Sequence, residues 1–256
     1  MKRSNNDNIL YENPLHWDAV NISDFVRAKL DEIKNSIPKD VTSIIDVGCG
    51  NGVLSNELSN TWQVIGIDRS RTALRGVVTP KVLGDIAHLP FRDESCDMTL
   101  CSEVLEHLPV DLLDKAVTEI LRITRKYILI TVPCKEYLPK NYIKCPTCGN
   151  VFNASYHVNT FDIDTLVKLF SDVFILRQFK CGKQVREYNP CLLKIKQHVG
   201  KSWARFSSDR HFICPNCRQT FLYKRTVNII SIFCDGLNRL VTRKHSYWLG
   251  VIFSKK

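Results

Sequence analysis

The chain has 256 residues, of which 44% are hydrophobic and 24% are charged, a balance that suits a globular protein and excludes collagen-like, disordered and coiled-coil chains. Its formal net charge is +10, and residues 181–256 hold 15 Lys and Arg against 3 Asp and Glu, so the basicity belongs to the C-terminal part. No apolar run approaches the roughly 20 residues of a membrane span, and the polar N-terminus does not resemble a signal peptide.

The predicted elements begin with a polar arm, residues 1–40, that contains a helix over residues 22–33 with Ser23 as its N-cap. Seven strands are then predicted, at residues 43–47, 63–67, 81–83, 98–101, 127–132, 173–179 and 247–254. Helices are predicted between or beside them, at residues 53–58, 71–75, 111–122, 161–170 and 227–240. This alternation predicts an α/β fold, a mostly parallel sheet with helices on both faces.

Two stretches interrupt the alternation, residues 134–160 and 182–240, and each carries a Cys-x-x-Cys pair. The pairs are Cys145/Cys148 and Cys214/Cys217. A tight Cys-x-x-Cys turn brings two thiolates to one tetrahedral centre, as in a zinc knuckle. We expect one structural zinc ion bound by all four cysteines, although the long separation leaves room for a redox dithiol, or for His157 or His211 as a ligand.

The other seven cysteines are scattered, and the full count of eleven is odd. Because no secretion signal is visible either, we expect a reducing, cytoplasmic location. The basic C-terminal part is predicted to meet a nucleic acid, an anionic membrane or a phosphorylated substrate, with ordinary solvated surface as the alternative. We expect four basic side chains of this part to recruit an anionic substrate: Lys194, Lys196, Lys201 and Arg205.

A glycine-rich loop follows the first predicted strand. Asp46 ends that strand, and Gly48, Gly50 and Gly52 follow at alternate positions. Glycines let a ligand approach the backbone closely, and the next helix offers free N–H groups to an anion. The loop departs from the dinucleotide fingerprint, whose third glycine would stand at Val53. Two further acids end the next strands, Asp68 and Asp85, at the edge where open parallel sheets bind ligands.

These motifs resemble those of the class I S-adenosylmethionine-dependent methyltransferases. The resemblance covers residues 40–135, with a looser match at residues 161–180 and 247–254. The four matching stretches are Asp46–Gly52, Gly66–Asp68, Gly84–Phe91 and Asp97–Pro109. The resemblance implies a Rossmann-like, seven-stranded sheet with an antiparallel last strand, and S-adenosylmethionine as the cofactor.

The same resemblance assigns roles around the cofactor. The glycine loop, with Asp46 at its start as a further cofactor-binding residue, would hold the methionine moiety, and the Asp68 carboxylate would accept both ribose hydroxyls. Asp85 and the backbone of Ile86 would read the adenine, and Ser102 would lie beside the methionine portion. Arg69 either stacks on the adenine or points to solvent.

The loop after the fourth strand indicates the acceptor. It lacks the Asn/Asp-Pro-Pro-aromatic run typical of enzymes that methylate base nitrogens, which favours a small molecule methylated at oxygen, phosphorylated or lipid-linked in view of the basic charge. Glu103, Glu106 and His107 would share one face of a helical turn, as in the similar run of ubiquinone-biosynthesis O-methyltransferases that is implicated in metal binding. His107 is alternatively a general base, or the run has neither role, because Leu-Glu-His-Leu is widespread in this fold without a metal.

Two rival functions remain. An RNA methyltransferase would use the zinc-bound basic part for RNA binding, although residues 181–256 carry no recognised RNA-binding motif. A catalytically silent binding protein would keep the fold alone. For the domain organisation we expect an N-terminal helical arm, residues 1–40, and a methyltransferase domain, residues 41–256. Its insertions 134–160 and 182–240 would leave the cofactor edge of the sheet and form a zinc-bound lid.

Overall fold

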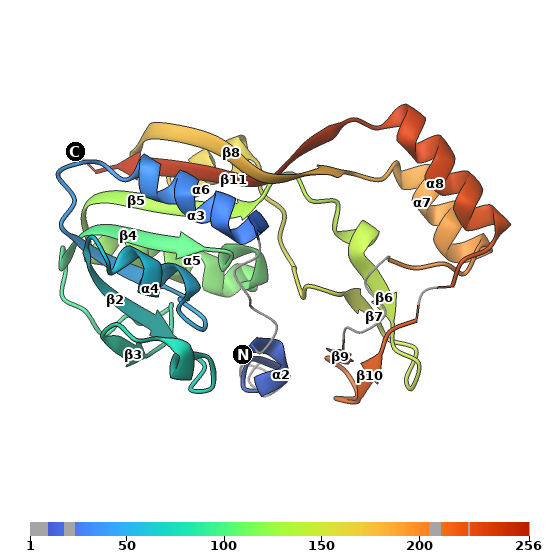
Figure 1. The fold of residues 1–256 in the computed structure, drawn as a ribbon, viewed down its shortest axis with the longest axis horizontal. Coiled ribbons are helices and arrows are strands. Elements are labelled where there is room, and N and C mark those ends of the chain that lie inside the picture. Colours follow the sequence, from blue (N-terminus) through green and yellow to red (C-terminus); the bar gives the residue numbers. More distant parts are fainter. Residues whose placement is uncertain (1–9, 18–23, 205–210, 225, 256) are drawn as a thin grey trace. The chain divides into compact units, whose positions relative to one another are not determined.

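The structure, a computed structural model, describes residues 10–17, 24–204, 211–224 and 226–255 (Figure 1). The chain divides into two compact units. The sheet unit comprises Tyr11–Cys134, Phe161–Lys183 and Ser246–Lys256. The hairpin unit comprises Lys135–Thr160 and Gln184–His245, together with Leu10. Its two long stretches nearly coincide with the predicted insertions.

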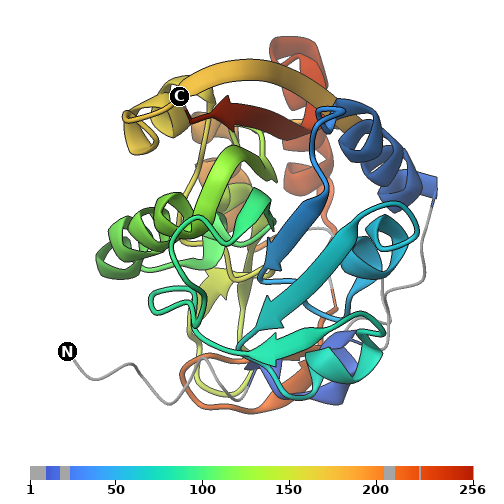
Figure 2. The same ribbon diagram turned by 90° about the vertical axis from the view of Figure 1, so that its left-hand side faces the viewer.

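One seven-stranded sheet forms the centre of the sheet unit (Figure 2). Its strands, in chain order, are β1 (Ser43–Val47), β2 (Gln63–Asp68), β3 (Lys81–Leu83), β4 (Cys96–Ser102), β5 (Thr124–Pro133), β8 (Phe174–Arg186) and β11 (Lys244–Ser254). In space the order is β3-β2-β1-β4-β5-β11-β8. The first five strands pair in parallel, and β11 pairs antiparallel with β5. The predicted seven-stranded, mostly parallel sheet is thus confirmed.

Helices cover both faces of this sheet. They are α3 (Asp24–Ser36), α4 (Val53–Leu58), α5 (Val110–Ile123) and α6 (Ile163–Leu169), with the short helix α2 (Pro14–Trp17) before them. Helix α3 runs three residues beyond its predicted end, and its predicted N-cap Ser23 lies outside the described residues. The predicted helix at residues 71–75 is a 3₁₀ turn, η1 (Ala73–Gly76). A capping box at Asp162 and Thr165 starts α6 two residues later than predicted.

The core lies on both faces of the sheet, because successive side chains of a strand point to opposite sides. Ile128 and Ile130 of β5 pack with α5 and α6, whereas Leu129 between them packs with α3 and α4. A tight contact joins β11 to β8: a Cβ atom on Gly250 would lie 2.1 Å from the ring of Phe179. Glycine at this position is therefore what allows the phenylalanine to lie flat against the neighbouring strand.

The hairpin unit holds two small antiparallel sheets and a group of helices. One sheet pairs β6 (Tyr142–Lys144) with β7 (Val151–Asn153), and the other pairs β9 (His211–Ile213) with β10 (Thr220–Leu222). The helices are η3 (Leu138–Asn141), α7 (Pro190–Lys194), a π-helical turn η4 (Ile195–Val199) and α8 (Ile229–Val241). Among the described helices, none has the length and apolar character needed to cross a membrane.

Candidate functional site

The glycine-rich loop between β1 and α4 has the backbone that its sequence requires. Gly48, Gly50 and Gly52 all have positive φ angles, of 75°, 55° and 83°. L-residues with a Cβ atom rarely adopt this left-handed region. At Gly52 space is limiting as well, because a Cβ atom would lie 2.9 Å from the Cα atom of Val77. The loop therefore turns sharply at the carboxyl edge of the sheet, immediately before the first turn of α4.

Asp68, the last residue of β2, faces this loop. The backbone N–H of Gly50 donates to its Oδ2 atom at 2.8 Å, and the N–H of Ser70 donates to Oδ1 at 2.8 Å. The residue is buried, and this desolvation raises the pKa of Asp68 above its usual range. Backbone N–H groups, that of Arg69 included, thus occupy part of the four acceptor positions of the carboxylate.

Asp46, the third acid predicted at the cofactor, lies deeper than Asp68. Its carboxylate is buried and accepts a hydrogen bond from the Ser55 hydroxyl at 2.5 Å, which ties β1 to α4. Complete burial raises the pKa of Asp46 to about 6. The side chain thus holds the ends of the glycine loop together.

The other predicted cofactor residues belong to the same unit. Asp85 accepts a hydrogen bond from the backbone N–H of Ala87 at 3.1 Å, and the half-buried Ile86 packs on the core. Ser102 shares a hydrogen bond of 2.8 Å with Thr131 of β5. The guanidinium of Arg69 lies 5.5 Å from the ring of Tyr11, an arrangement that neither predicted role for Arg69 foresaw.

The segment Tyr11–Trp17 closes over this loop, and the sequence analysis missed it. Both carboxylate oxygens of Glu12 accept backbone N–H groups, from Arg71 at 2.8 Å and Thr72 at 3.1 Å. The Ser70 hydroxyl and the Trp17 indole N–H both donate to the carbonyl of Tyr11, each at 2.7 Å.

Trp17 also packs against the loop itself. A Cβ atom on Gly50 would lie 2.9 Å from the indole ring. Residues about 60 positions apart in the chain therefore share hydrogen bonds, for which no sequence spacing gives a signal. Tyr11, Glu12 and Trp17 thus lie beside the candidate cofactor residues Gly50 and Asp68.

The acidic run after β4 differs from its prediction. The turn that would align Glu103, Glu106 and His107 is only a 3₁₀ turn, η2 (Leu105–His107). Glu103 precedes this turn and has a left-handed φ of 58°. The prediction that Glu103 shares one helical face with Glu106 and His107 is therefore wrong. The Glu106 side chain is buried, and the half-buried ring of His107 meets the ring of Tyr11 edge-on at 6.2 Å.

The Glu103 carboxylate instead binds a cation and an indole. Its Oε2 atom accepts the Trp248 indole N–H at 2.6 Å, and its Oε1 atom lies 3.4 Å from Nζ of Lys29. The buried Lys29 ammonium also lies 4.4 Å from the centre of the Trp248 ring. These contacts join α3, the loop after β4 and the start of β11 within the sheet unit.

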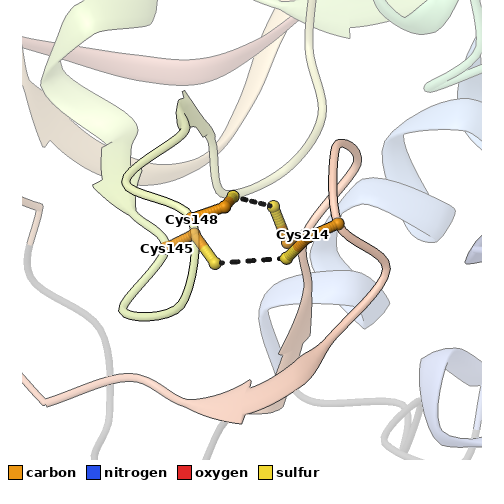
Figure 3. Close-up of side chains that lie close together, drawn as sticks. Cys145, Cys148 and Cys214 are labelled. Atoms are coloured by element: carbon orange, nitrogen blue, oxygen red, sulfur yellow. Dashed lines mark hydrogen bonds between the residues drawn. The ribbon is translucent and has the colours of Figure 1, made fainter.

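The hairpin unit brings both cysteine pairs together (Figure 3). Sγ of Cys145 lies 3.7 Å from Sγ of Cys217, Sγ of Cys148 lies 3.6 Å from Sγ of Cys214, and all four sulfurs lie within 4.8 Å of one another. A tetrahedral zinc ion with bonds of about 2.3 Å separates its sulfur ligands by about 3.8 Å. A disulfide would require about 2.05 Å. The four residues therefore fit a zinc ion.

Each pair lies at the tip of one hairpin, and the two tips have the same backbone geometry. The N–H groups of Gly149 and Arg218 donate to the carbonyls of Cys145 and Cys214, at 3.0 and 2.9 Å. Both residues have left-handed φ angles, of 73° and 63°.

The thiols of the cluster shift in opposite directions. The N–H of Asn150 lowers the pKa of the Cys148 thiol to about 6. At Cys217 the Gln219 N–H is outweighed by burial and the neighbouring cysteines, which raise the pKa of the Cys217 thiol to about 12. The alternative histidine ligands lie elsewhere: the ring of His157 hydrogen-bonds to Glu136, and His211 is exposed on β9.

Comparison with known proteins adds a family match. Residues 45–129 match the family described as a methyltransferase domain. A stretch of 133 residues is 32% identical to an uncharacterized protein of Methanocaldococcus jannaschii, covering 50% of this chain and 56% of that protein. A stretch of 92 residues is 35% identical to the ubiquinone biosynthesis O-methyltransferase of Ralstonia nicotianae, covering 32% of this chain and 39% of that enzyme.

The matched stretches thus span about half, or less, of the length of these curated relatives. Among solved structures, a SAM-dependent methyltransferase from Archaeoglobus fulgidus is similar with a TM-score of 0.55 at 17% identity, covering 91% of this chain and 94% of that one. This likeness concerns the fold.

Proposed function

We propose that the protein transfers a methyl group from S-adenosylmethionine to a small-molecule acceptor, because residues 45–129 match a methyltransferase domain. The observation that carries the proposal is the Asp68 carboxylate, which is buried beside the glycine loop and has acceptor positions left for a diol. S-adenosylmethionine supplies a methyl group on a sulfonium, which needs no further activation. The protein's task is to orient the acceptor and take up its proton.

The cofactor residues follow from the loop outward. Free N–H groups at the start of α4 would bind the methionine carboxylate over Gly48, Gly50 and Gly52. Asp68 would bind the ribose hydroxyls. Asp85, the Ile86 backbone and Ser102 keep their predicted roles at the adenine and at the methionine portion. Arg69 would border the adenine together with Tyr11, over whose ring it lies.

We propose oxygen as the methylated atom and His107 as the group that takes up the acceptor's proton. The similarity to a ubiquinone biosynthesis O-methyltransferase supports an O-methylated small molecule, and the basic C-terminal part supports a phosphorylated or lipid-linked one. Lys196 does not support this recruitment, because it is buried and bound to Asp235, and Arg205 lies outside the described residues.

The experiment is transfer of labelled methyl from S-adenosylmethionine to separate panels of phenols, lipid-linked phenols, phosphorylated small molecules and RNA. We expect transfer to a small molecule at oxygen and none to RNA. His107→Gln should lower kcat and leave cofactor affinity unchanged, with the exposed His198→Gln as the control. Methylated RNA would establish the rival function, and a protein that does not bind S-adenosylmethionine would overturn the proposal.

We also propose one structural zinc ion per chain, bound by Cys145, Cys148, Cys214 and Cys217. The sulfur separations and the paired knuckle geometry support it. Metal analysis of the purified protein should find one zinc ion per chain. Cys148→Ser should lose most of it, whereas the exposed Cys191→Ser should keep it. A full zinc content in Cys148→Ser would contradict this ligand set.

The predicted lid and location remain proposals. If the insertions cover the acceptor, Cys148→Ser should lower turnover and spare S-adenosylmethionine affinity. Equal losses in both would refute the lid. The proposal of a reducing, cytoplasmic location rests on the odd number of cysteines and on the two Cys-x-x-Cys pairs, which suit a metal site better than a disulfide framework.

A further inference from the structure

Helix α8 exposes an apolar stripe. Ile229, Ile232, Phe233 and Leu240 follow one another at helical spacing on one side of it, with exposed fractions of 85%, 60%, 64% and 81%. Gly236 lies on the same side, and a Cβ atom added there would meet nothing within 4 Å. Single exposed apolar residues are common, but a continuous stripe along a helix marks a surface that something else covers.

The opposite side of α8 faces inward and carries hydrogen-bonding groups beside one cysteine. Ser231, Cys234 and Asn238 are buried, and Asn238 bonds to the N–H of Asn189 at 2.8 Å and to the carbonyl of Glu187 at 3.0 Å. Asp235 accepts hydrogen bonds from the Tyr188 hydroxyl and the Lys196 ammonium, both at 2.7 Å. Helix α8 thus has the reverse of the usual arrangement, with hydrogen-bonding groups inside and apolar groups outside.

The neighbouring turn η4, which packs against α8, shows the same reversal. Its Lys196 and Gln197 are buried, whereas Ile195 and Val199 are exposed. Gln197 donates to the carbonyl of Pro139 at 2.9 Å. Two helical segments that are about 30 residues apart in sequence therefore turn their polar sides toward the unit and their apolar sides outward.

The charges beside this surface have one sign. Lys194, Lys201, Arg239, Arg243 and Lys244 are exposed on or next to the two segments. In the described residues 190–204 and 226–244, Asp235 is the one acidic residue, and it is paired with Lys196. Apolar side chains flanked by unopposed basic groups are the composition that binds an anionic lipid surface.

We propose that α8 and η4 dock the protein on an anionic membrane surface. Ile229, Ile232, Phe233 and Leu240 would enter the boundary between headgroups and acyl chains, and the flanking Lys and Arg would meet lipid phosphates. A second copy of the chain fits the surface less well, because a two-fold contact would bring like charges together. The proposal does not depend on methyl transfer, so its test measures binding.

The test is co-sedimentation of the full chain with phosphatidylcholine vesicles that contain either no or 30% phosphatidylglycerol. We expect binding to the anionic vesicles only, weakening as salt rises. Ile232→Ser/Phe233→Ser should lower the partition coefficient about tenfold or more, on the scale of two apolar side chains left in water. Arg239→Gln/Arg243→Gln should lower it about fivefold for each charge removed.

The matched control is Val78→Ser/Val110→Ser, the same kind of change at exposed valines of the sheet unit, which should bind as the unaltered protein does. Thermal unfolding of each variant checks that it is folded, which we expect because the substituted positions are exposed. Failure of the full chain to bind anionic vesicles would overturn the proposal, as would equal binding by Ile232→Ser/Phe233→Ser. A dimer in solution that this double variant turns into a monomer would identify a second copy as the occupant.

Discussion

Replacing Asp68 tests the cofactor site most directly. The N–H groups of Gly50 and Ser70 donate to its carboxylate at 2.8 Å each, and the acceptor capacity that remains would bind the ribose hydroxyls. Hydrogen bonds to a charged group contribute about 1.5–3 kcal/mol each, so losing one of them should raise Kd about 10- to 150-fold. Asp68→Ala also frees the Gly50 N–H and loosens the loop, so its loss should exceed that of Asp68→Asn.

Isothermal titration of each variant with S-adenosylmethionine and with S-adenosylhomocysteine measures this loss. Both ligands carry the same ribose, so both affinities should fall by the same factor. Asp172→Asn, the same change at an exposed site, is the control. Unchanged affinity in a folded Asp68→Ala variant would refute the reasoning.

A pH series adds a second readout of the same site. Burial raises the pKa of Asp68. Lowering the pH below this raised pKa protonates the carboxylate, so the unaltered protein should bind S-adenosylmethionine more weakly there. Asp68→Asn does not titrate and should show a flatter profile.

Three further predictions concern the scaffold. Burial raises the pKa of Asp46 from 3.8 to about 6, so its favourable contribution is complete below pH 3.8 and is lost as the pH rises through 6. Asp46→Asn should therefore match the unaltered protein at pH 4 and be about 2–3 kcal/mol more stable at pH 8 in denaturant unfolding, and equal stability at both would contradict this. Gly250→Ala should cost about 1–3 kcal/mol because its methyl group would overlap the Phe179 ring, whereas Gly236→Ala should gain up to about 1 kcal/mol on the open face of α8. Glu12→Gln should expose the N-terminal segment to limited proteolysis and weaken S-adenosylmethionine binding; a protease pattern like that of the unaltered chain would argue against the closing role of this segment.

Local patterns explain which parts of the fold could be predicted. Strands β1, β2 and β5 are short apolar runs between helical segments, and the loop glycines occupy positions that need left-handed backbone. The contacts of Glu12 could not be predicted, because its partners Arg71 and Thr72 are distant in sequence and are backbone groups with no residue signature. Tertiary contacts decided these features.

Helix α8 shows a different limit of the sequence. Its periodicity predicted a helix over residues 227–240, close to the observed Ile229–Val241, but periodicity alone does not say which side is buried. The inward side was decided by partners from other elements, such as Asn189 for Asn238. Residue type and spacing predicted each Cys-x-x-Cys pair. That the two pairs lie close enough to share one ion depends on how the two hairpins pack, for which local sequence gives no signal.

The position of the four cysteines along the chain has a consequence for the entropy of unfolding. Cys148 and Cys214 are 66 residues apart, and Cys145 and Cys217 are 72 apart, so a metal ion bound by all four closes a long loop. Treated like a covalent cross-link, such a closure removes about 4 kcal/mol of chain entropy from the unfolded state. The loop also encloses Phe161–Lys183, which carries α6 and most of the edge strand β8 of the sheet unit. If zinc is bound there, a chelator should lower the global free energy of unfolding by about this amount, and amide hydrogens of β8 that exchange only through global unfolding should then exchange faster.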